Sequence, residues 1–193
     1  MVAQKDKLTI SIVGDSFSSD SGELSWITML SENYNIKNFS QRGISQYRLH
    51  TLVTQNLQAL IESNFVIIFH TNPDRVYVPD HVEFSARKLT SHTHCDLVAT
   101  TALQDPTFKY TADSYYRCFF DEAQQNLFYN LLVKDIQQLT CNVKTVHCSG
   151  FETGIVKSFD QLLKQHRGAT NHYDKTGNCL VYNYICDQIN ETL

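Results

Sequence analysis

The stretch KLTISIVGDSFS, from Lys7 to Ser18, joins an apolar segment to a short polar turn. Residues 7–13 are rich in aliphatic and β-branched side chains and end at a glycine, a pattern that predicts a short buried strand. The turn that follows, Gly14-Asp15-Ser16, places a hydroxyl directly beyond the strand. In open α/β sheets, ligands bind outside the carboxyl ends of the strands. The stretch therefore indicates where a functional site belongs if the rest of the chain builds such a sheet.

Beyond residue 18 the sequence alternates between segments of helical periodicity and apolar runs of strand length. The predicted helices cover residues 22–34, 44–61, 121–139, 156–165 and a last segment starting near Asp174, and the further strands cover 36–39, 65–69 and 142–147. The run from Phe65 to Phe69 is apolar throughout, as is typical of a central strand covered on both faces. The alternation predicts an α/β fold with a mostly parallel sheet and helices on both faces.

Length and composition limit the class of protein. A chain of 193 residues with 42% hydrophobic and 19% charged residues suits a single globular domain, residues 1–193. The formal net charge is −4 and no basic run occurs, so nucleic acid is not an expected partner. No apolar run approaches the roughly 20 residues that span a bilayer. With no signal peptide ahead of the first strand, we expect a cytoplasmic protein whose six cysteines are mostly reduced and buried.

Polar residues follow each of the predicted strands. The first strand leads to Ser16, the second to Gln41-Arg42-Gly43, and the third to His70-Thr71-Asn72-Pro73-Asp74. Asn171-His172-Tyr173-Asp174 precedes the last helix. A hydroxyl, a glycine amide, a carboxamide and an imidazole are thus expected at one edge of the sheet. These groups supply the nucleophile, the oxyanion donors and the base that acyl transfer needs.

Four blocks in this order resemble the SGNH hydrolases, also called the GDSL esterase and lipase superfamily. Ile10 to Ser18 matches the strand followed by G-D-S, and Asn38 to Ser45 resembles the segment with the oxyanion glycine. His70 to Pro73 matches the family's G-x-N-D only at Asn72, and His172 to Asn178 is close to its H-x-x-x-x-G-N pattern. The resemblance implies a three-layer α-β-α sandwich, flavodoxin-like, whose mostly parallel sheet has four to five strands, the first four ordered 2-1-3-4.

The resemblance also implies a role for particular residues of this chain. Ser16 is the expected nucleophile and His172 the general base. The oxyanion hole is expected to comprise the backbone amides of Ser16 and Gly43 and the side chain of Asn72. Three further residues are candidates for contacting the substrate: Asp15, His70 and Tyr173.

The chain also departs from the family pattern. An Asp usually lies three residues before the catalytic His, and Ala169 occupies that place here. The third block has His70 in place of its Gly and Pro73 in place of its Asp. Without the carboxylate, we expect a Ser–His dyad whose imidazole is oriented by a backbone carbonyl near residues 169–170, or a fold that has lost catalysis.

Each of these residues also has an interpretation without chemistry. Ser16 suits the N-cap of a following helix, and Asp15 suits a turn that its carboxylate braces through backbone amides. Gly43 fills a place where the chain turns tightly, and Asn72 before a proline is a common turn residue. Asp174, which opens the last helix, is better explained as an N-cap than as the missing acid.

Two other features of the sequence concern ligand binding: a set of His and Cys residues and a long segment without periodicity. His92, His94 and Cys95, with Cys141, His147 and Cys148, lack the paired spacings of a zinc site, so we expect neither metal nor cofactor. Between about residues 77 and 120 the periodicity weakens, and we expect a lid-like insertion that sets specificity. Its aromatic residues suit either a pocket wall or a satellite core: Tyr77, Phe84, Phe108, Tyr110, Tyr115, Tyr116, Phe119 and Phe120.

The resulting expectation is a serine hydrolase that cleaves a small-molecule or carbohydrate ester through an acyl-enzyme. The resemblance makes an O-acetyl group on a carbohydrate the first substrate to consider. The alternative is a catalytically impaired SGNH-like module that binds a ligand or a partner protein. A phosphate-binding domain is disfavoured, since the turn after the first strand lacks both the G-x-G-x-x-G and the G-K-[ST] pattern.

Overall fold

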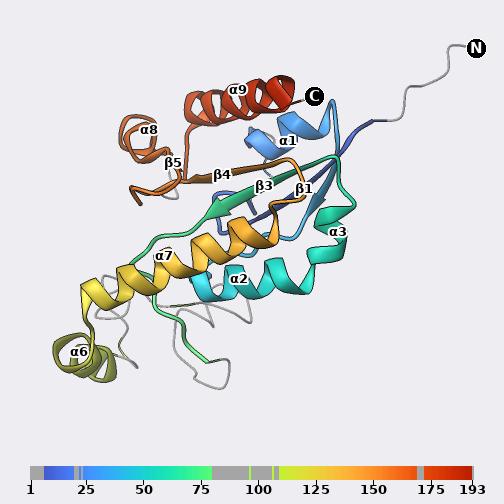
Figure 1. The fold of residues 1–193 in the computed structure, drawn as a ribbon. Coiled ribbons are helices and arrows are strands. Elements are labelled where there is room, and N and C mark those ends of the chain that lie inside the picture. Colours follow the sequence, from blue (N-terminus) through green and yellow to red (C-terminus); the bar gives the residue numbers. More distant parts are fainter. Residues whose placement is uncertain are drawn as a thin grey trace, which may run out of the picture.

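A parallel sheet of five strands forms the middle layer of the computed structural model (Figure 1). The structure describes residues 7–19, 22, 24–79, 96, 106, 109–168 and 172–192. The strands are β1 Thr9–Gly14, β2 Asn35–Asn38, β3 Phe65–His70, β4 Thr145–Ser149 and β5 Lys157–Ser158. Their order is β2-β1-β3-β4-β5, and all neighbours are parallel. This confirms the predicted fold class and the order 2-1-3-4, and the fifth strand lies at the edge beside β4.

Helices cover both faces of the sheet (Figure 1). One layer contains α1 Trp26–Ser31, α8 Asp160–Gln165 and α9 Lys175–Thr192. The opposite layer contains α2 Gln46–Gln55, α3 Leu57–Ile61 and α7 Glu122–Leu139. Helix α6, Lys109–Cys118, lies beyond the sheet, near the end at which the arrow of β3 points. None of the described helices is both long and apolar enough to cross a membrane.

The helix predicted over residues 44–61 is divided into α2 and α3 at Asn56. The backbone of Asn56 has φ −107° and ψ 10°, outside the helical range, and its side chain donates to the Leu52 carbonyl at 2.8 Å. Asparagine competes with helix in this way because its amide bonds nearby backbone groups. The strand predicted over 142–147 begins later, at Thr145.

The insertion predicted over residues 77–120 contains one helix among the described residues, α6, where the sequence predicted no regular element. Only Ala112 of this helix is buried, so an apolar face long enough to produce a clear period is missing. Phe84, Phe108 and the cluster at residues 92–95 lie outside the described residues.

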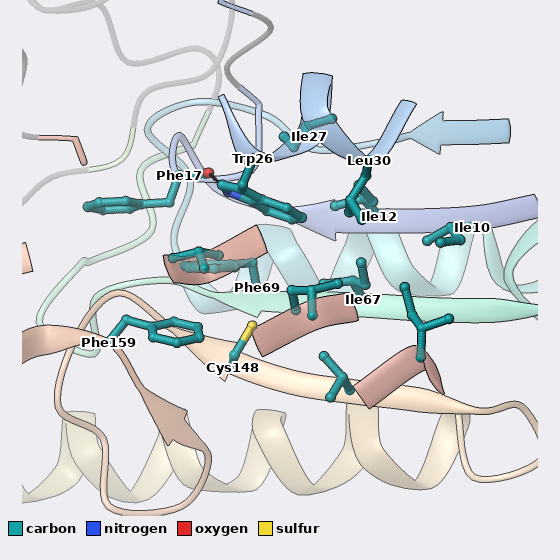
Figure 2. Packing of buried hydrophobic residues seen from close by; sticks show 14 of the residues in the cluster. Ile10, Ile12, Phe17, Trp26, Ile27, Leu30, Ile67, Phe69, Cys148 and Phe159 are labelled. Carbon is teal, nitrogen blue, oxygen red and sulfur yellow. Dashed lines mark hydrogen bonds between the residues drawn. The ribbon is translucent and has the colours of Figure 1, made fainter. Parts of the chain in front are cut away.

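The two faces of the sheet are packed with different side chains. On the α1, α8 and α9 side, Phe69 stacks between Trp26 at 5.9 Å and Phe159 at 6.1 Å, and Phe17 joins it at 6.1 Å (Figure 2). The α2 and α7 side is aliphatic: Val13, Ile44, Leu49, Leu52, Val53, Leu60, Val66, Ile68 and Ile136. Both cores reach β3, whose residues are all buried as its unbroken apolar run predicted.

Five cysteines lie within the described residues, and all five are free thiols. Cys148 is buried beside Phe69 and Phe159 in the aromatic core (Figure 2). Cys118 and Cys141 are exposed, and Cys179 and Cys186 are partly exposed. The prediction that most of the cysteines are buried is therefore wrong, since only Cys148 of the five described cysteines is buried.

Candidate active site

Ser16 occupies a braced turn at the carboxyl end of β1. The Asp15 carboxylate accepts the Phe17 backbone N–H at 3.0 Å, and the Asp15 carbonyl accepts the Ser18 N–H at 3.1 Å. The Trp26 indole N–H donates to the Phe17 carbonyl at 2.9 Å (Figure 2). The predicted bracing role of Asp15 is thus confirmed. The turn is held on both sides of Ser16, whose own side chain is partly exposed.

The N-cap interpretation of Ser16 does not hold. The first described helix after the turn is α1, and Ser25 caps it by accepting the Thr28 N–H. Gly14 of the same block is required by space, because a Cβ there would lie 2.2 Å from Ser18 Oγ and 2.6 Å from the Phe69 carbonyl oxygen. The Gly-Asp-Ser sequence is therefore explained by a close approach of β1 to β3, a carboxylate brace and an outward serine.

Gly43 lies in a turn that only glycine adopts readily, with φ +71°. The turn follows β2, so Gly43 lies at the same edge of the sheet as Ser16. Its carbonyl accepts the Asp96 N–H at 2.7 Å and Arg75 Nη1 at 3.4 Å.

Asn72 follows β3 and forms a turn with the residues after it. Its Oδ1 accepts the Asp74 N–H at 2.8 Å, and its carbonyl accepts the Arg75 N–H at 3.1 Å. The turn interpretation is confirmed, and it has a chemical consequence. Because Oδ1 must face the donating amide of Asp74, the Nδ2 group points away from the turn. Asn72 can therefore serve as a turn residue and as a hydrogen-bond donor together.

Three hydrogen-bond donors are available at this edge. In the part of the chain that the structure describes, Ser16 N, Gly43 N and Asn72 Nδ2 donate to no protein acceptor. The order β2-β1-β3 places the three residues on adjacent strand ends. Backbone amides and a carboxamide are the kinds of donor from which oxyanion holes are built.

His172 belongs to a short segment that returns to the turn containing Ser16. Its ring meets Phe17 edge-on, with centroids 5.1 Å apart, and its carbonyl accepts the Gly168 N–H at 2.6 Å. Tyr173 pairs with Arg167 in an antiparallel bridge, which closes the segment. The structure thus brings His172 against the residue that directly follows Ser16. Ala169 and residues 170–171 lie outside the described residues.

The start of α9 fixes the end of the His172 segment. Asp174 accepts the Gly177 N–H at 2.8 Å, which confirms its predicted role as an N-cap. A Cβ at Gly177 would lie 2.9 Å from Tyr173 Cβ and 3.0 Å from His166 Cβ, so the glycine of the fourth block is required by packing. Asn178 donates to the Tyr173 carbonyl at 3.0 Å and accepts the Trp26 N–H at 3.2 Å.

The three candidate substrate contacts are all buried. Asp15, His70 and Tyr173 expose 2%, 0% and 6% of their surface. Burial raises the pKa of Asp15 to about 6, although the Phe17 N–H and the charge of Arg75 act in the opposite direction. Burial also raises the pKa of Tyr173. A contact between these side chains and a substrate stays a prediction.

His70 begins a buried chain of hydrogen bonds under the site. Gln46 Nε2 donates to His70 Nδ1 at 2.9 Å, so the proton of the neutral His70 ring lies on Nε2 and points to His147 Nδ1 at 3.1 Å. His147 Nε2 in turn lies 3.4 Å from Thr140 Oγ1. Burial, with the nearby His147, lowers the pKa of His70 well below its usual value, and burial lowers that of His147 to about 4. Both rings are therefore neutral at pH 7.

The aromatic residues of the insertion form both a cluster and a wall. Tyr116 packs against Phe120 at 5.2 Å and against Tyr115 at 5.3 Å. Tyr115, Phe119 and Phe120 line an open groove of about 370 Å³ together with residues of α7, and Phe119 exposes 76% of its surface. Gln125, at the rim of this groove, donates to the Pro73 carbonyl at 3.0 Å, which joins the groove to the Asn72 loop. Within the described residues, no three His, Cys, Asp or Glu side chains come together as metal ligands.

The fold built by these elements occurs in other solved structures. A protein assigned to the lipolytic G-D-S-L family from Desulfitobacterium hafniense DCB-2 aligns over 94% of this chain and 99% of its own, with 12% identity and a TM-score of 0.50. TesA aligns over 96% and 99% with 12% identity and a TM-score of 0.49. The psychrotrophic esterase EstA from Pseudoalteromonas sp. aligns over 95% and 97% with 16% identity and a TM-score of 0.45. No family model matches the sequence, and no curated protein does so significantly.

The alignment with the G-D-S-L family protein, together with the sheet order, identifies the class of fold. The chain has the SGNH hydrolase fold, as the four sequence blocks implied. At identities of 10–16% the likeness concerns the fold, and the chemistry has to be argued from the residues of this chain.

Proposed function

We propose that this protein is a serine hydrolase that cleaves a carboxylic ester through an acyl-enzyme. The observation that supports the proposal is that Ser16, Gly43 and Asn72 follow the carboxyl ends of the neighbouring strands β1, β2 and β3, and that Ser16 N, Gly43 N and Asn72 Nδ2 donate to no acceptor within the described residues. The ring contact between His172 and Phe17 supports His172 as the base at this edge. A nucleophile, a base and an oxyanion hole on one site are the requirements of acyl transfer.

The reaction proceeds in two halves. His172 takes the proton of Ser16 Oγ as this oxygen attacks the ester carbonyl, and the three donors stabilise the resulting oxyanion. Collapse of the tetrahedral intermediate breaks the bond to the alcohol, which leaves with the proton from His172. Water then attacks the acyl-enzyme, again with His172 as base, and releases the carboxylic acid and free Ser16.

The substrate class follows from the resemblance and from the small size of the domain. We propose an ester with a short acyl group, such as an O-acetyl group on a carbohydrate or another small molecule. The groove beside Gln125, with its aromatic lining, supports a binding place for the alcohol part next to the Asn72 loop. Aromatic side chains suit this task because sugar rings stack on them.

The proposed base works without the usual carboxylate, because Ala169 stands three residues before His172. In serine proteases the acid is worth up to about 10⁴ in kcat, and the residual catalysis remains above that of water. We therefore propose a slow Ser–His dyad in which the oxyanion hole supplies the larger share of the rate enhancement. A binding module without catalysis is the alternative that this substitution favours.

The test uses p-nitrophenyl acetate turnover and labelling by a fluorophosphonate probe. We expect wild-type protein to turn over the ester and to carry the label on the peptide that contains Ser16. Ser16→Ala removes both signals, and His172→Ala lowers both by about 10⁴. Mass spectrometry of the labelled peptide identifies the modified residue.

Matched substitutions control for the loss of a hydroxyl or an imidazole elsewhere. Ser31→Ala removes an exposed hydroxyl of α1, and His50→Ala removes an exposed imidazole of α2 that pairs with Asp135 at 2.6 Å. Both controls are expected to behave as wild type. Equal turnover in wild type, Ser16→Ala and His172→Ala would contradict the hydrolase and favour the binding module.

A further inference from the structure

Asp96 is a buried carboxylate that accepts hydrogen bonds from three residues. It exposes 2% of its surface, and it lies outside the four sequence blocks. Oδ2 accepts the Ser45 N–H at 2.8 Å, Oδ1 accepts the Val78 N–H at 2.9 Å, and Arg48 Nε bonds both oxygens at 3.0 and 3.1 Å. A carboxylate this buried is stable only with such a full set of donors.

The backbone of Asp96 extends the same connection. Its N–H donates to the Gly43 carbonyl at 2.7 Å, and its carbonyl accepts Arg75 Nη1 at 2.9 Å. The same Arg75 nitrogen lies 3.4 Å from the Gly43 carbonyl, and Arg48 Nη2 donates to the Val78 carbonyl at 2.7 Å. One residue thus contacts the segment after β2 on one side and the segment after β3 on the other.

The connection matters because β2 and β3 do not pair with each other. In the order β2-β1-β3, the strand β1 separates them, so no ladder bond fixes the distance between the loops that follow. Gly43 lies on one of these loops and Asn72 on the other. The bonds of Asp96 join the loops directly, because they reach Gly43 and Ser45 on one side and Arg75 and Val78 on the other.

From this placement we propose that Asp96 is a positioning residue, which holds the Gly43 amide and the Asn72 side chain at the spacing that one oxyanion requires. The inference rests on the proposed function for its chemical meaning, but the coupling of the two loops is a property of the fold. Asp96 itself touches no reacting atom. Its effect is expected in the transition state, where both donors act on the same oxygen and misplacement by about 1 Å lowers the rate about 10²-fold.

The coupling is tested first without reference to activity. Asp96→Asn keeps the size of the side chain, but its amide group opposes donors that the carboxylate accepted. We expect hydrogen exchange measured by mass spectrometry to rise at least tenfold in residues 43–48 and 75–78 together, while β1 and β3 keep their wild-type protection. Asp135→Asn, which alters an exposed ion pair with His50, is the matched control and leaves both segments unchanged. A rise in only one segment, or in all of the domain, would overturn the inference.

The second test separates positioning from a merely structural role. With p-nitrophenyl acetate, we expect Asp96→Asn to lower kcat by about 10²–10³ with KM within threefold of wild type, as for the loss of an oxyanion donor. Asn72→Ala should have a similar effect in wild type but less than a tenfold effect in the Asp96→Asn background, since that donor is already misplaced. Effects that multiply in the double variant would mean that the two residues act independently, contrary to the proposal.

Two further outcomes distinguish a failure of the inference about Asp96 from a failure of the proposed function. If wild type neither hydrolyses the ester nor takes the label, the proposed function fails, and hydrogen exchange still decides whether Asp96 couples the two loops. If Asp96→Asn does not fold, Asp96→Glu replaces it in both tests. This variant keeps the charge on a longer side chain, and we expect about a tenfold lower kcat and a correlated rise in exchange of both segments; wild-type values for either would overturn the inference.

Discussion

The two halves of the candidate site are held by different physical means. The oxyanion half, around Gly43 and Asn72, is fixed by directional hydrogen bonds that end on the buried charges of Asp96 and Arg48. In the base half the rings of His172 and Tyr173 pack against Phe17 at 5.1 and 5.2 Å, and the His172 carbonyl accepts the Gly168 N–H at 2.6 Å. Hydrogen bonds to charged groups are shorter and stronger than those between neutral groups. The comparison indicates that bonds to buried charged side chains hold the oxyanion half, whereas aromatic packing and backbone bonds hold the segment of the base.

The difference extends to how the halves respond to pH. Beneath the oxyanion half lie groups whose pKa values shift in opposite directions: upward for Asp15, and downward for His70 and His147. Both shifts have burial as their main cause, since the charged form of each group is disfavoured away from water. The stability of this half should therefore vary with pH through named residues, and substitution of each one tests the comparison.

The largest effect is expected for His147. Its pKa is lowered to about 4 from 6.5, so its contribution to stability is complete above pH 6.5 and is lost as the pH falls through 4. We expect the free energy of unfolding of wild type to fall by roughly 3 kcal/mol more between pH 7 and 4 than that of His147→Asn. Asn keeps an acceptor for His70 but does not titrate. Urea unfolding at several pH values measures the difference, and parallel pH profiles would show that the ring is not buried as neutral imidazole.

Asp15→Asn should change the pH profile with the opposite sign. A carboxyl whose pKa is raised from 3.8 to about 6 binds its proton more tightly when folded, so it destabilises the fold increasingly from pH 3.8 to 6 and fully above. Asn retains an acceptor for the Phe17 N–H and avoids the buried charge. We expect the variant to be more stable than wild type by about 2 kcal/mol at pH 8 and by nothing at pH 4. A variant less stable at pH 8 would show that the charge of Asp15 is itself stabilised by its surroundings.

These two residues also show how far the sequence alone leads. The layer architecture, the strand order and the placement of Ser16, Gly43 and Asn72 at one edge follow from apolar runs, helical periods and four motif blocks. Asp15 is recognised as a brace because Asx turns are local. Such features need only neighbouring residues, and the structure agrees with them.

Features that depend on contacts between residues far apart in the chain could not be predicted from the sequence. Asp96 lies in a stretch without periodicity, and its donors come from positions 18 to 51 residues away, so no spacing reveals it. The pairing of His70 with His147 across two strands, 77 residues apart, is likewise visible only once the register of β3 and β4 is known. The break at Asn56, which divides the predicted helix into α2 and α3, depends on the bond from its side chain to the Leu52 carbonyl.

A smaller effect is expected when the base half is given a carboxylate. The resemblance places an Asp where this chain has Ala169, and a carboxylate there stabilises the imidazolium and fixes its tautomer. We expect Ala169→Asp to raise kcat for p-nitrophenyl acetate about tenfold, with KM unchanged. Ala169→Asn, which carries no charge, is the control and should give no gain in the imidazolium-dependent step. An unchanged kcat in a folded Ala169→Asp variant would mean that the His172 ring is already oriented by another group.

The smallest effect is expected for Tyr173, and it decides whether this side chain acts through packing alone. The Tyr173 hydroxyl is buried and, within the described residues, has no hydrogen-bond partner; a Cβ on Gly150 would lie 3.3 Å from it. Removing an unpaired buried hydroxyl relieves its desolvation, so Tyr173→Phe should raise the free energy of unfolding by up to about 1 kcal/mol. Calorimetry and ester kinetics on the same sample measure both properties.

If the ring of Tyr173 acts only through its contact with Phe17, kcat and KM of Tyr173→Phe stay within twofold of wild type, whereas Tyr173→Ala loses about 3 kcal/mol of stability. A several-fold rise in KM of the Phe variant without loss of stability would instead make the hydroxyl a substrate contact. The Tyr173 hydroxyl would then bind the ligand from the base half, as the donors of Gly43 and Asn72 are proposed to do from the oxyanion half. The two halves would then differ in the number of polar groups that contact the ligand.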